Sequence, residues 1–149
     1  EDKAWTIRRL EALATRRLIE QRFVDTQQDL WIILGDLNEP SASEARGERA
    51  IAPLENGFAV DLMLRVPETE RWTYYDPHSG VYHCPDTMLA SPALAKKFPA
   101  AIPFVVRKGL GTEVARFQGS RLARVGAHRP HASDHAALAI DFPDLKTTA

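Results

Sequence analysis

The chain has 149 residues, a formal net charge of -1 at neutral pH and 44% hydrophobic residues. This length corresponds to a single domain, 1–149, or to part of a larger one, and the near-neutral charge excludes a chain-wide basic field of the kind that attracts nucleic acid. No apolar run approaches the roughly 18 residues that a membrane span needs. The one cysteine excludes an internal disulfide and leaves the compartment open.

The first third of the chain predicts a long helix, a strand and a second helix. Residues 3–28 contain neither Gly nor Pro, and the fully apolar run 30–34 predicts a buried strand. Ser41 and Ser43 are candidate N-caps of a helix that runs through Ala52. The apolar residues that recur at helical spacing in the first helix are Ile7, Leu10, Ala14 and Leu18.

The rest of the chain predicts short strands separated by loops. Residues 58–64 are apolar around Asp61 and are ambiguous between helix and strand, whereas the glycines of 109–126 indicate a loop. Strands are expected at 72–75, 87–90, 102–106 and 136–142. Together these elements predict an α/β (α+β) domain without an internal repeat.

Two acidic motifs adjoin predicted strands. Gly35-Asp36-Leu37-Asn38 follows the first strand, and Ser133-Asp134-His135 precedes the last. Taken alone, the first motif is also typical of a turn, and the second of a loop whose Ser and Asp bond the local backbone. Together they supply two carboxylates, an amide and an imidazole, a set that suits a hard divalent cation and a water that attacks a phosphate.

Two further motifs lie between these. Trp72-Thr73-Tyr74-Tyr75 is an aromatic-Thr-Tyr strand, and the run from Cys84 to Pro92 contains Asp86 and ends in Ser-Pro. With these four motifs in this order, the chain resembles the C-terminal half of the endonuclease/exonuclease/phosphatase superfamily, which includes DNase I and exonuclease III. Within the run from Cys84, the residues Cys84, Pro85 and Thr87 depart from the Ile-Asp-Tyr pattern of the family.

The resemblance implies half of a four-layer αββα sandwich, in which a mixed, mostly antiparallel sheet is covered by helices on one face. The N-terminal half of the family domain supplies an early Asn and a metal-binding Glu, and no such motif precedes Gly35 here. We therefore interpret 1–149 as the C-terminal part of such a domain and expect self-association through the uncovered sheet face. Candidates for that face are Ala137, Ala139 and parts of 30–34 and 102–106.

The resemblance also implies roles for five residues. Asp36 would orient or deprotonate the attacking water, and Asn38 would donate to a phosphate oxygen or touch a metal. Asp134 would be the metal-side carboxylate, with Mg²⁺ or Mn²⁺ as the cofactor and Asp36 and Asn38 as further candidate ligands. His135 would stabilise the charge developing on phosphorus, and Asp86 would hold its ring in orientation.

A local basic stretch precedes the second acidic motif. It is either a solvated loop or a rim that steers phosphate, since Arg matches phosphate geometry well. His128 and Arg129 are the candidate substrate-phosphate residues. His78 and His83 are weaker candidates because no fixed metal-ligand spacing links them. The members of the stretch are Arg121, Arg124, His128, Arg129 and His131.

The sequence therefore predicts a divalent-metal-dependent phosphoesterase that hydrolyses phosphodiester or phosphomonoester bonds, with nucleic acid placed ahead of phospholipids and inositol phosphates. Two alternatives stay open: a catalytically silent fragment or scaffold, and an unrelated α/β binding domain that carries the motifs by chance. If the resemblance holds, Asp36, Asn38, Asp86, Asp134 and His135 will cluster at one edge of a sheet. Asp36 and His135 on opposite sides of the domain would contradict it.

Overall fold

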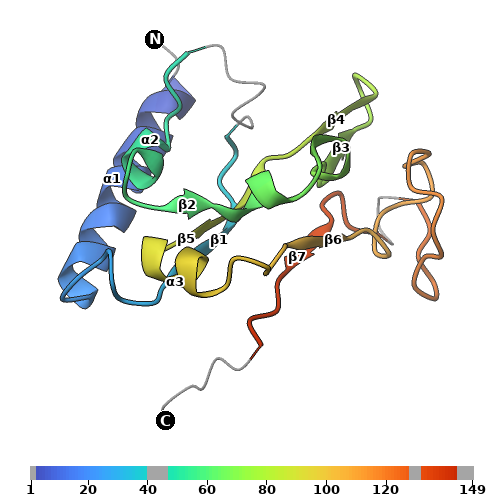
Figure 1. The fold of residues 1–149 in the computed structure, drawn as a ribbon. Helices are drawn as coiled ribbons and strands as arrows, with labels where there is room; N and C mark the ends of the chain where they lie inside the picture. Colours follow the sequence, from blue (N-terminus) through green and yellow to red (C-terminus); the bar gives the residue numbers. More distant parts are fainter. Residues whose placement is uncertain (1–2, 40–46, 128–131, 144–149) are drawn as a thin grey trace.

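The computed structural model describes residues 3–39, 47–127 and 132–143 (Figure 1). The first elements are α1 (Lys3–Arg22), β1 (Ile32–Asp36), α2 (Ala52–Glu55), β2 (Val60–Asp61) and two 3-10 helices, η1 (Leu62–Arg65) and η2 (Glu68–Glu70). They are followed by β3 (Tyr74–Asp76), β4 (Val81–His83), β5 (Asp86–Ala90), α3 (Pro92–Lys97), β6 (Phe104–Val106) and β7 (Ala137–Ala139). None of the helices in these ranges combines the length and the apolar character that a bilayer crossing requires.

The central sheet is antiparallel and has the strand order β1–β5–β2. Two further antiparallel pairs, β3–β4 and β6–β7, complete the strands. Helices and antiparallel sheets thus occur together, which confirms the mixed α/β class. In the central sheet Ile33 lies opposite Leu89, and Asp36 lies opposite Asp86. Because side chains alternate along a strand, each such pair shares one face.

One face of the central sheet is covered by α1 and α2. Ala12 of α1 and Leu54 of α2 pack in one buried cluster with Leu89 of β5. Trp31, Ile51 and Phe58 complete this cluster, and the ring centroids of Trp31 and Phe58 lie 5.1 Å apart. Figure 1 shows α1 and α2 side by side at the same flank of the sheet.

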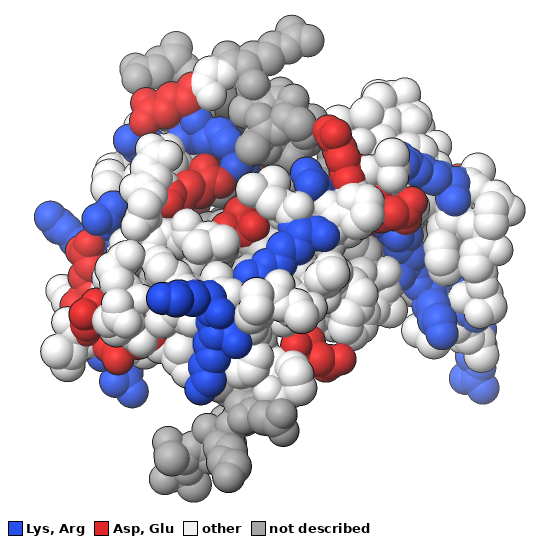
Figure 2. Space-filling model, viewed as in Figure 1, with Lys and Arg blue, Asp and Glu red and all other residues white. Residues whose placement is uncertain are grey.

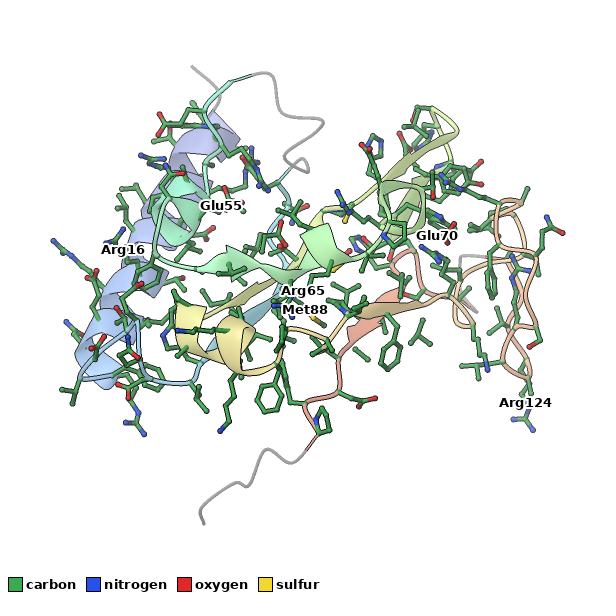
Figure 3. All side chains as sticks on the ribbon, viewed as in Figure 1. Arg16, Glu55, Arg65, Glu70, Met88 and Arg124 are labelled. Carbon is green, nitrogen blue, oxygen red and sulfur yellow. The ribbon has the colours of Figure 1, made fainter. Side chains whose placement is uncertain are left out.

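The opposite face of the sheet is also covered, so the expectation of helices on one face only is wrong. Met88 and Ala90 of β5 pack with Leu94 of α3 and Leu62 of η1. Arg65, labelled in Figure 3, donates hydrogen bonds to the carbonyls of Ala95, Phe98 and Ala101 and so ties η1 to the end of α3. The residues that pack against this cluster include Leu138 of β7 and, after it in the chain, Ile140 and Phe142.

Apolar side chains are uncovered on the β6–β7 pair as well as at Leu34 of β1. Phe104 lies opposite Ala139 and Val106 opposite Ala137, so these four side chains share one face, which we call the outer face of β6–β7. Phe104 and Val106 are 47% and 37% exposed. Both alanines and part of 102–106 were expected on an uncovered sheet face: Ala137, Phe104 and Val106 are exposed, whereas Ala139 is half-buried.

Other expectations from the sequence need correction. The first helix ends at Arg22, not near residue 28, because the Asp25 carboxylate accepts the backbone N–H groups of Gln27 and Gln28 and forms a turn there. The expected buried strand at 30–34 is the edge strand β1, in which Leu34 is 56% exposed. An edge strand lacks a neighbour on one side, and its side chains gain less cover.

The second predicted helix begins later than expected. Residues 47–51 are not helical, and α2 starts at Ala52, with Pro53 in its first turn. Proline is favoured at this position because its missing N–H has no partner there in any case. The proposed N-caps Ser41 and Ser43 lie outside the described residues.

A polar cluster lies between α2 and η1. Arg49 forms an ion pair with Glu55, and the Asp61 carboxylate accepts the N–H of Met63 at 2.9 Å and caps η1. Burial raises the pKa of the Asp61 carboxyl and also the pKa of Glu55, although Arg49 opposes both shifts. The cluster therefore holds its protons more tightly in the folded protein than in the unfolded chain.

This cluster predicts a pH-dependent gain in stability for Asp61→Asn. The folded-state pKa of Asp61 lies above the unfolded value of about 4, so the charged form costs stability as the pH rises through that window. Asn keeps the acceptor for Met63 and cannot ionise. In urea denaturation the variant should be more stable than the wild type at pH 7 and equal to it near pH 3.

A matched control is Asp76→Asn. The hydrogen bonds from Ser79 and from the backbone of His78 lower the pKa of the exposed Asp76 carboxyl, so its charged form favours folding above the unfolded pKa. Asp76→Asn should not stabilise the protein at pH 7. Equal pH profiles for wild type and Asp61→Asn would contradict the cost assigned to the buried charge.

Candidate active site

The site begins at the end of the β1–β5 ladder. Asp36 is the last residue of β1, Asp86 is the first of β5, and the two are paired in register. One further backbone bond, from Leu37 N–H to the Pro85 carbonyl at 3.2 Å, extends the contact beyond the strands. The ladder therefore fixes two carboxylates on the same face and at the same end of the sheet.

His135 lies between these two carboxylates. Its Nδ1 is 2.8 Å from Oδ2 of Asp86, and its Nε2 is 3.8 Å from Oδ2 of Asp36. Asp86 is only 9% exposed. An ionised carboxylate can only accept, so Nδ1 carries the hydrogen of this bond. The ring is held with Nε2 directed to Asp36.

Thr73 supports Asp86 from below. Its hydroxyl donates to Oδ2 of Asp86 at 2.5 Å, and the side chain is completely buried. The Thr73 carbonyl also accepts the N–H of Ala136 at 2.7 Å, which joins the segment of His135 to the β3 segment. From the sequence, Thr73 was expected only as part of the aromatic-Thr-Tyr strand and had no predicted role. Its position between Trp72 and Tyr74 was the one sequence feature that could have indicated a buried hydroxyl.

Aromatic and hydroxyl groups set the backbone around His135. The Tyr74 ring lies 4.9 Å from the His135 ring, and the two residues form an isolated antiparallel bridge. The Ser133 hydroxyl accepts the backbone N–H of His135 at 3.2 Å. Ser133 therefore shapes the turn that presents His135, which is the local role expected of a Ser at such a position.

Asn38 and Asp134 border the pocket in front of this arrangement. Asn38 has a φ of +50° and donates its N–H to Oδ1 of Asp36 at 2.8 Å. An open pocket of about 570 Å³ is lined by Asn38, Glu39, Tyr74, His83, Pro85, Asp134 and His135. Asp36 opens instead into an adjoining pocket of about 170 Å³ that Asn38 also lines.

The predicted clustering is therefore confirmed: the expected residues Asp36, Asn38, Asp86, Asp134 and His135 lie together at one end of the central sheet. Asp36 and His135 are neighbours and do not lie on opposite sides of the domain. His83, which the sequence ranked low, lines the same pocket.

The basic stretch is described only in part. His128, Arg129 and His131 lie outside the described residues. The Arg121 guanidinium donates to the carbonyls of Leu110, Gly111 and Val114, which favours a role in holding this loop over a role in steering phosphate. Arg124 projects outward at the far end of the molecule from α1 (Figure 3).

Basic residues form no continuous surface on the face shown in Figure 2. Lys and Arg side chains are interspersed there with acidic and neutral ones. Several arginines elsewhere donate hydrogen bonds to backbone carbonyls. Arg107 donates to the carbonyls of Glu70 and Trp72, and its guanidinium lies 4.0 Å from the Trp72 ring centroid. Burial lowers the pKa of Arg107.

The donor types at the site fit a hard divalent cation. Asp36, Asn38 and Asp134 offer oxygen atoms, and Mg²⁺ prefers oxygen ligands and usually binds through one or two carboxylates together with several waters. Within 3–39, 47–127 and 132–143, no three His, Cys, Asp or Glu side chains gather closely enough to hold a metal ion by themselves.

Comparison with protein-family models found no family that matches this chain, and comparisons with curated proteins and with solved structures found no significant match. The functional assignment therefore depends on the geometry of the chain's own residues.

The hydrogen bond from Thr73 to Asp86 should make a measurable contribution to the free energy of unfolding. Thr73→Val removes a buried donor to a carboxylate and should lower the free energy of unfolding by about 1.5–3 kcal/mol, the range for hydrogen bonds to charged groups. In an Asp86→Asn background the bond is no longer charge-assisted, and Thr73→Val should cost less. Urea denaturation at pH 7 measures all four proteins. The same cost in both backgrounds would show that the hydroxyl does not stabilise the carboxylate.

Proposed function

We propose that this chain is the C-terminal part of a divalent-metal-dependent phosphoesterase of the endonuclease/exonuclease/phosphatase type. The observation that carries the proposal is His135 held between Asp86 and Asp36, with Nδ1 bonded to one carboxylate and Nε2 directed to the other. A buried acid that orients an imidazole beside a second, more exposed acid suits the hydrolysis of a charged ester.

In this proposal Asp36 acts on the attacking water and His135 acts on the phosphate. Asp36 orients the attacking water and takes its proton on Oδ2, because Oδ1 accepts the Asn38 N–H whereas Oδ2 lies 3.8 Å from Nε2 of His135, beyond hydrogen-bond distance. His135 presents Nε2 to the charge that develops on the phosphate oxygens. Asp86 and Thr73 keep the ring in place through a buried hydrogen-bonded chain.

Asn38 and Asp134 bind at the open side of the site. Asn38 donates its amide to a phosphate oxygen, and Asp134 lies in the wall of the same pocket. A bound Mg²⁺ or Mn²⁺ would neutralise the phosphate charge, with Asp134, Asp36 and Asn38 as its candidate ligands. We propose His128 and Arg129 as contacts to the substrate phosphate.

The proposed substrate class is a phosphodiester or phosphomonoester, with nucleic acid ahead of phospholipids and inositol phosphates. The open pocket of about 570 Å³ supports a substrate with a group larger than phosphate alone. A four-layer αββα sandwich is proposed for the complete domain. The stacking of α1 and α2 on one face of the central sheet supports it, whereas α3 and η1 pack, with Leu138, on the other face, where the second sheet would lie.

A catalytically silent scaffold is a second candidate. The resemblance assigns a further metal-binding Glu to the N-terminal half of the family domain, and no such motif precedes Gly35 here. If the remaining ligands come from another segment of a longer protein, the 149-residue chain alone will show no measurable phosphoesterase activity.

Metal binding separates these candidates. Paramagnetic Mn²⁺ added to the ¹⁵N-labelled chain should broaden the amide signals of Asn38, Asp134 and His135 first. Asp134→Ala should weaken this broadening because a carboxylate at the pocket is lost. The matched control is Glu20→Ala, which removes an exposed carboxylate from α1 and should leave the broadening unchanged.

Activity is tested in parallel on bis(p-nitrophenyl) phosphate and on DNA, with the chain and with any longer protein that contains it. Where turnover is found, Asp134→Ala and EDTA should each reduce the rate by about 10²-fold or more, the cost of losing one positioned electrostatic group. Full activity in EDTA would rule out a hard-cation mechanism, and uniform broadening by Mn²⁺ would rule out this metal site.

Self-association is proposed through the outer face of β6–β7, with a second copy of the chain as the partner. Soluble monomers rarely expose a contiguous apolar patch beyond about 300–600 Å². Sedimentation velocity should show association that increases with concentration, and Phe104→Lys should suppress it. Leu122→Lys, at an exposed leucine outside this face, is the control for added charge. A monomer at millimolar concentration would contradict the proposal.

A further inference from the structure

Glu39 is a buried carboxylate directly after Asn38. Only 4% of its surface is exposed. Burial of a carboxylate is strongly unfavourable unless its oxygens are paired. Residues that follow a turn are usually solvated, so the burial of Glu39 calls for a specific set of partners.

Both carboxylate oxygens of Glu39 have a donor. Oε2 accepts from Nε of Arg8 at 3.1 Å, and Oε1 accepts the backbone N–H of Ala50 at 2.7 Å. Arg8 belongs to α1, whereas Ala50 lies in the turn that leads into α2. One side chain therefore connects the loop after β1 to two separate parts of the helical layer.

The turn between Asp36 and Glu39 has a conformation that needs such support. Asn38 has a φ of +50°, a left-handed conformation that Asn tolerates but that most residues avoid. On its upstream side the turn is held by the β1–β5 ladder and by the bond from Leu37 N–H to the Pro85 carbonyl. On its downstream side the first anchored residue is Glu39.

We propose that Glu39 and Arg8 form a positioning pair that fixes Asn38 at the mouth of the site. Its consequence for catalysis rests on the proposed function, whereas its effect on the turn does not. The pair acts through Asn38: both oxygens of Glu39 are engaged by Arg8 and Ala50, so Glu39 itself neither accepts a proton from the attacking water nor binds the phosphate. Fixing Glu39 fixes the exit of the turn and, with it, the amide of Asn38 in the pocket shared with Asp134 and His135.

The test measures the order parameter of the Asn38 backbone N–H by ¹⁵N relaxation in the full chain. Wild type, Glu39→Gln, Arg8→Gln and the double variant are compared. Gln retains the size of Glu39 and an oxygen for the Ala50 N–H, and only the ion pair is lost. The order parameter of Asn38 should fall from about 0.85 to below about 0.6 in each single variant, with no further loss in the double variant because both changes remove the same interaction.

The control is the ion pair of Arg9, the residue that follows Arg8 on α1. Arg9 forms an ion pair with Glu48 at 3.0 Å, and Glu48 is far more exposed than Glu39. Glu48→Gln should leave Asn38 ordered. If Glu39→Gln does not fold, Arg8→Lys carries the same test, because Lys keeps the charge but cannot reproduce the Nε contact.

The catalytic arm uses hydrolysis of bis(p-nitrophenyl) phosphate with Mg²⁺. Glu39→Gln and Arg8→Gln should lower kcat by about 10- to 100-fold, the cost typical of lost supporting contacts, while KM changes by less than about twofold and Glu48→Gln matches wild type. An Asn38 amide that stays rigid in Glu39→Gln, or losses that add in the double variant, would overturn the positioning pair. If neither this chain nor any longer protein that contains it hydrolyses an ester, while Asn38 loosens as expected, the proposed function is overturned and the pair stays supported.

Discussion

The antiparallel register of β1 with β5 is the constraint on which the site depends. It sets Asp36 opposite Asp86, and a slip by one residue would move either side chain to the other face of the sheet. The register is itself held by the core, because Leu89 and Met88 point to opposite faces and each is packed into its own cluster. Packing of apolar side chains on both faces therefore decides where two carboxylates meet.

The second requirement is that a nearly buried carboxylate be satisfied. Asp86 accepts from the Thr73 hydroxyl and from His135, and the Thr73 backbone also pairs with Ala136. The polar chain and the strand contacts therefore support each other. A change in Thr73 affects the orientation of His135 even though the two side chains share no direct bond, since both are attached to the same oxygen of Asp86.

The sequence predicts the local parts of this structure better than the contacts between distant parts. The strands β1 and β5 were expected at 30–34 and 87–90 from their apolar runs, and the structure has them at Ile32–Asp36 and Asp86–Ala90, so that each also includes its acidic residue. The α3 helix was not predicted, although Ser91 caps it and Pro92 opens it, because the helix is only 6 residues long and carries little periodic signal. The β4 strand was missed because its side chains at 81–83 show no clear apolar alternation.

The roles of distant partners were beyond the reach of pattern analysis for a physical reason. Nothing in the residues around Glu39 indicates that Arg8, 31 positions earlier, will bury it. The pairs Arg8-Arg9 and Arg16-Arg17 of α1 are typical of a solvated helix face, yet Arg8 and Arg16 both reach across to other segments. Arg16, labelled in Figure 3, lies over the Phe58 ring. Long side chains can bury their stems and still place a charge at a specific acceptor, and only the tertiary fold selects that acceptor.

The bond between His135 and Asp86 closes a loop of 49 residues, and His135 approaches Asp36 across nearly twice that separation in the chain. Contacts of this range form late in folding, because the entropy of closing a long loop must be overcome before the contact is gained. The β1–β5 ladder can assemble before the segment of His135 has docked. During synthesis the chain would therefore carry the facing carboxylates of Asp36 and Asp86 before the imidazole of His135 is in place. The complete centre would arise only when the segment of His135, the last of the three in chain order, has docked.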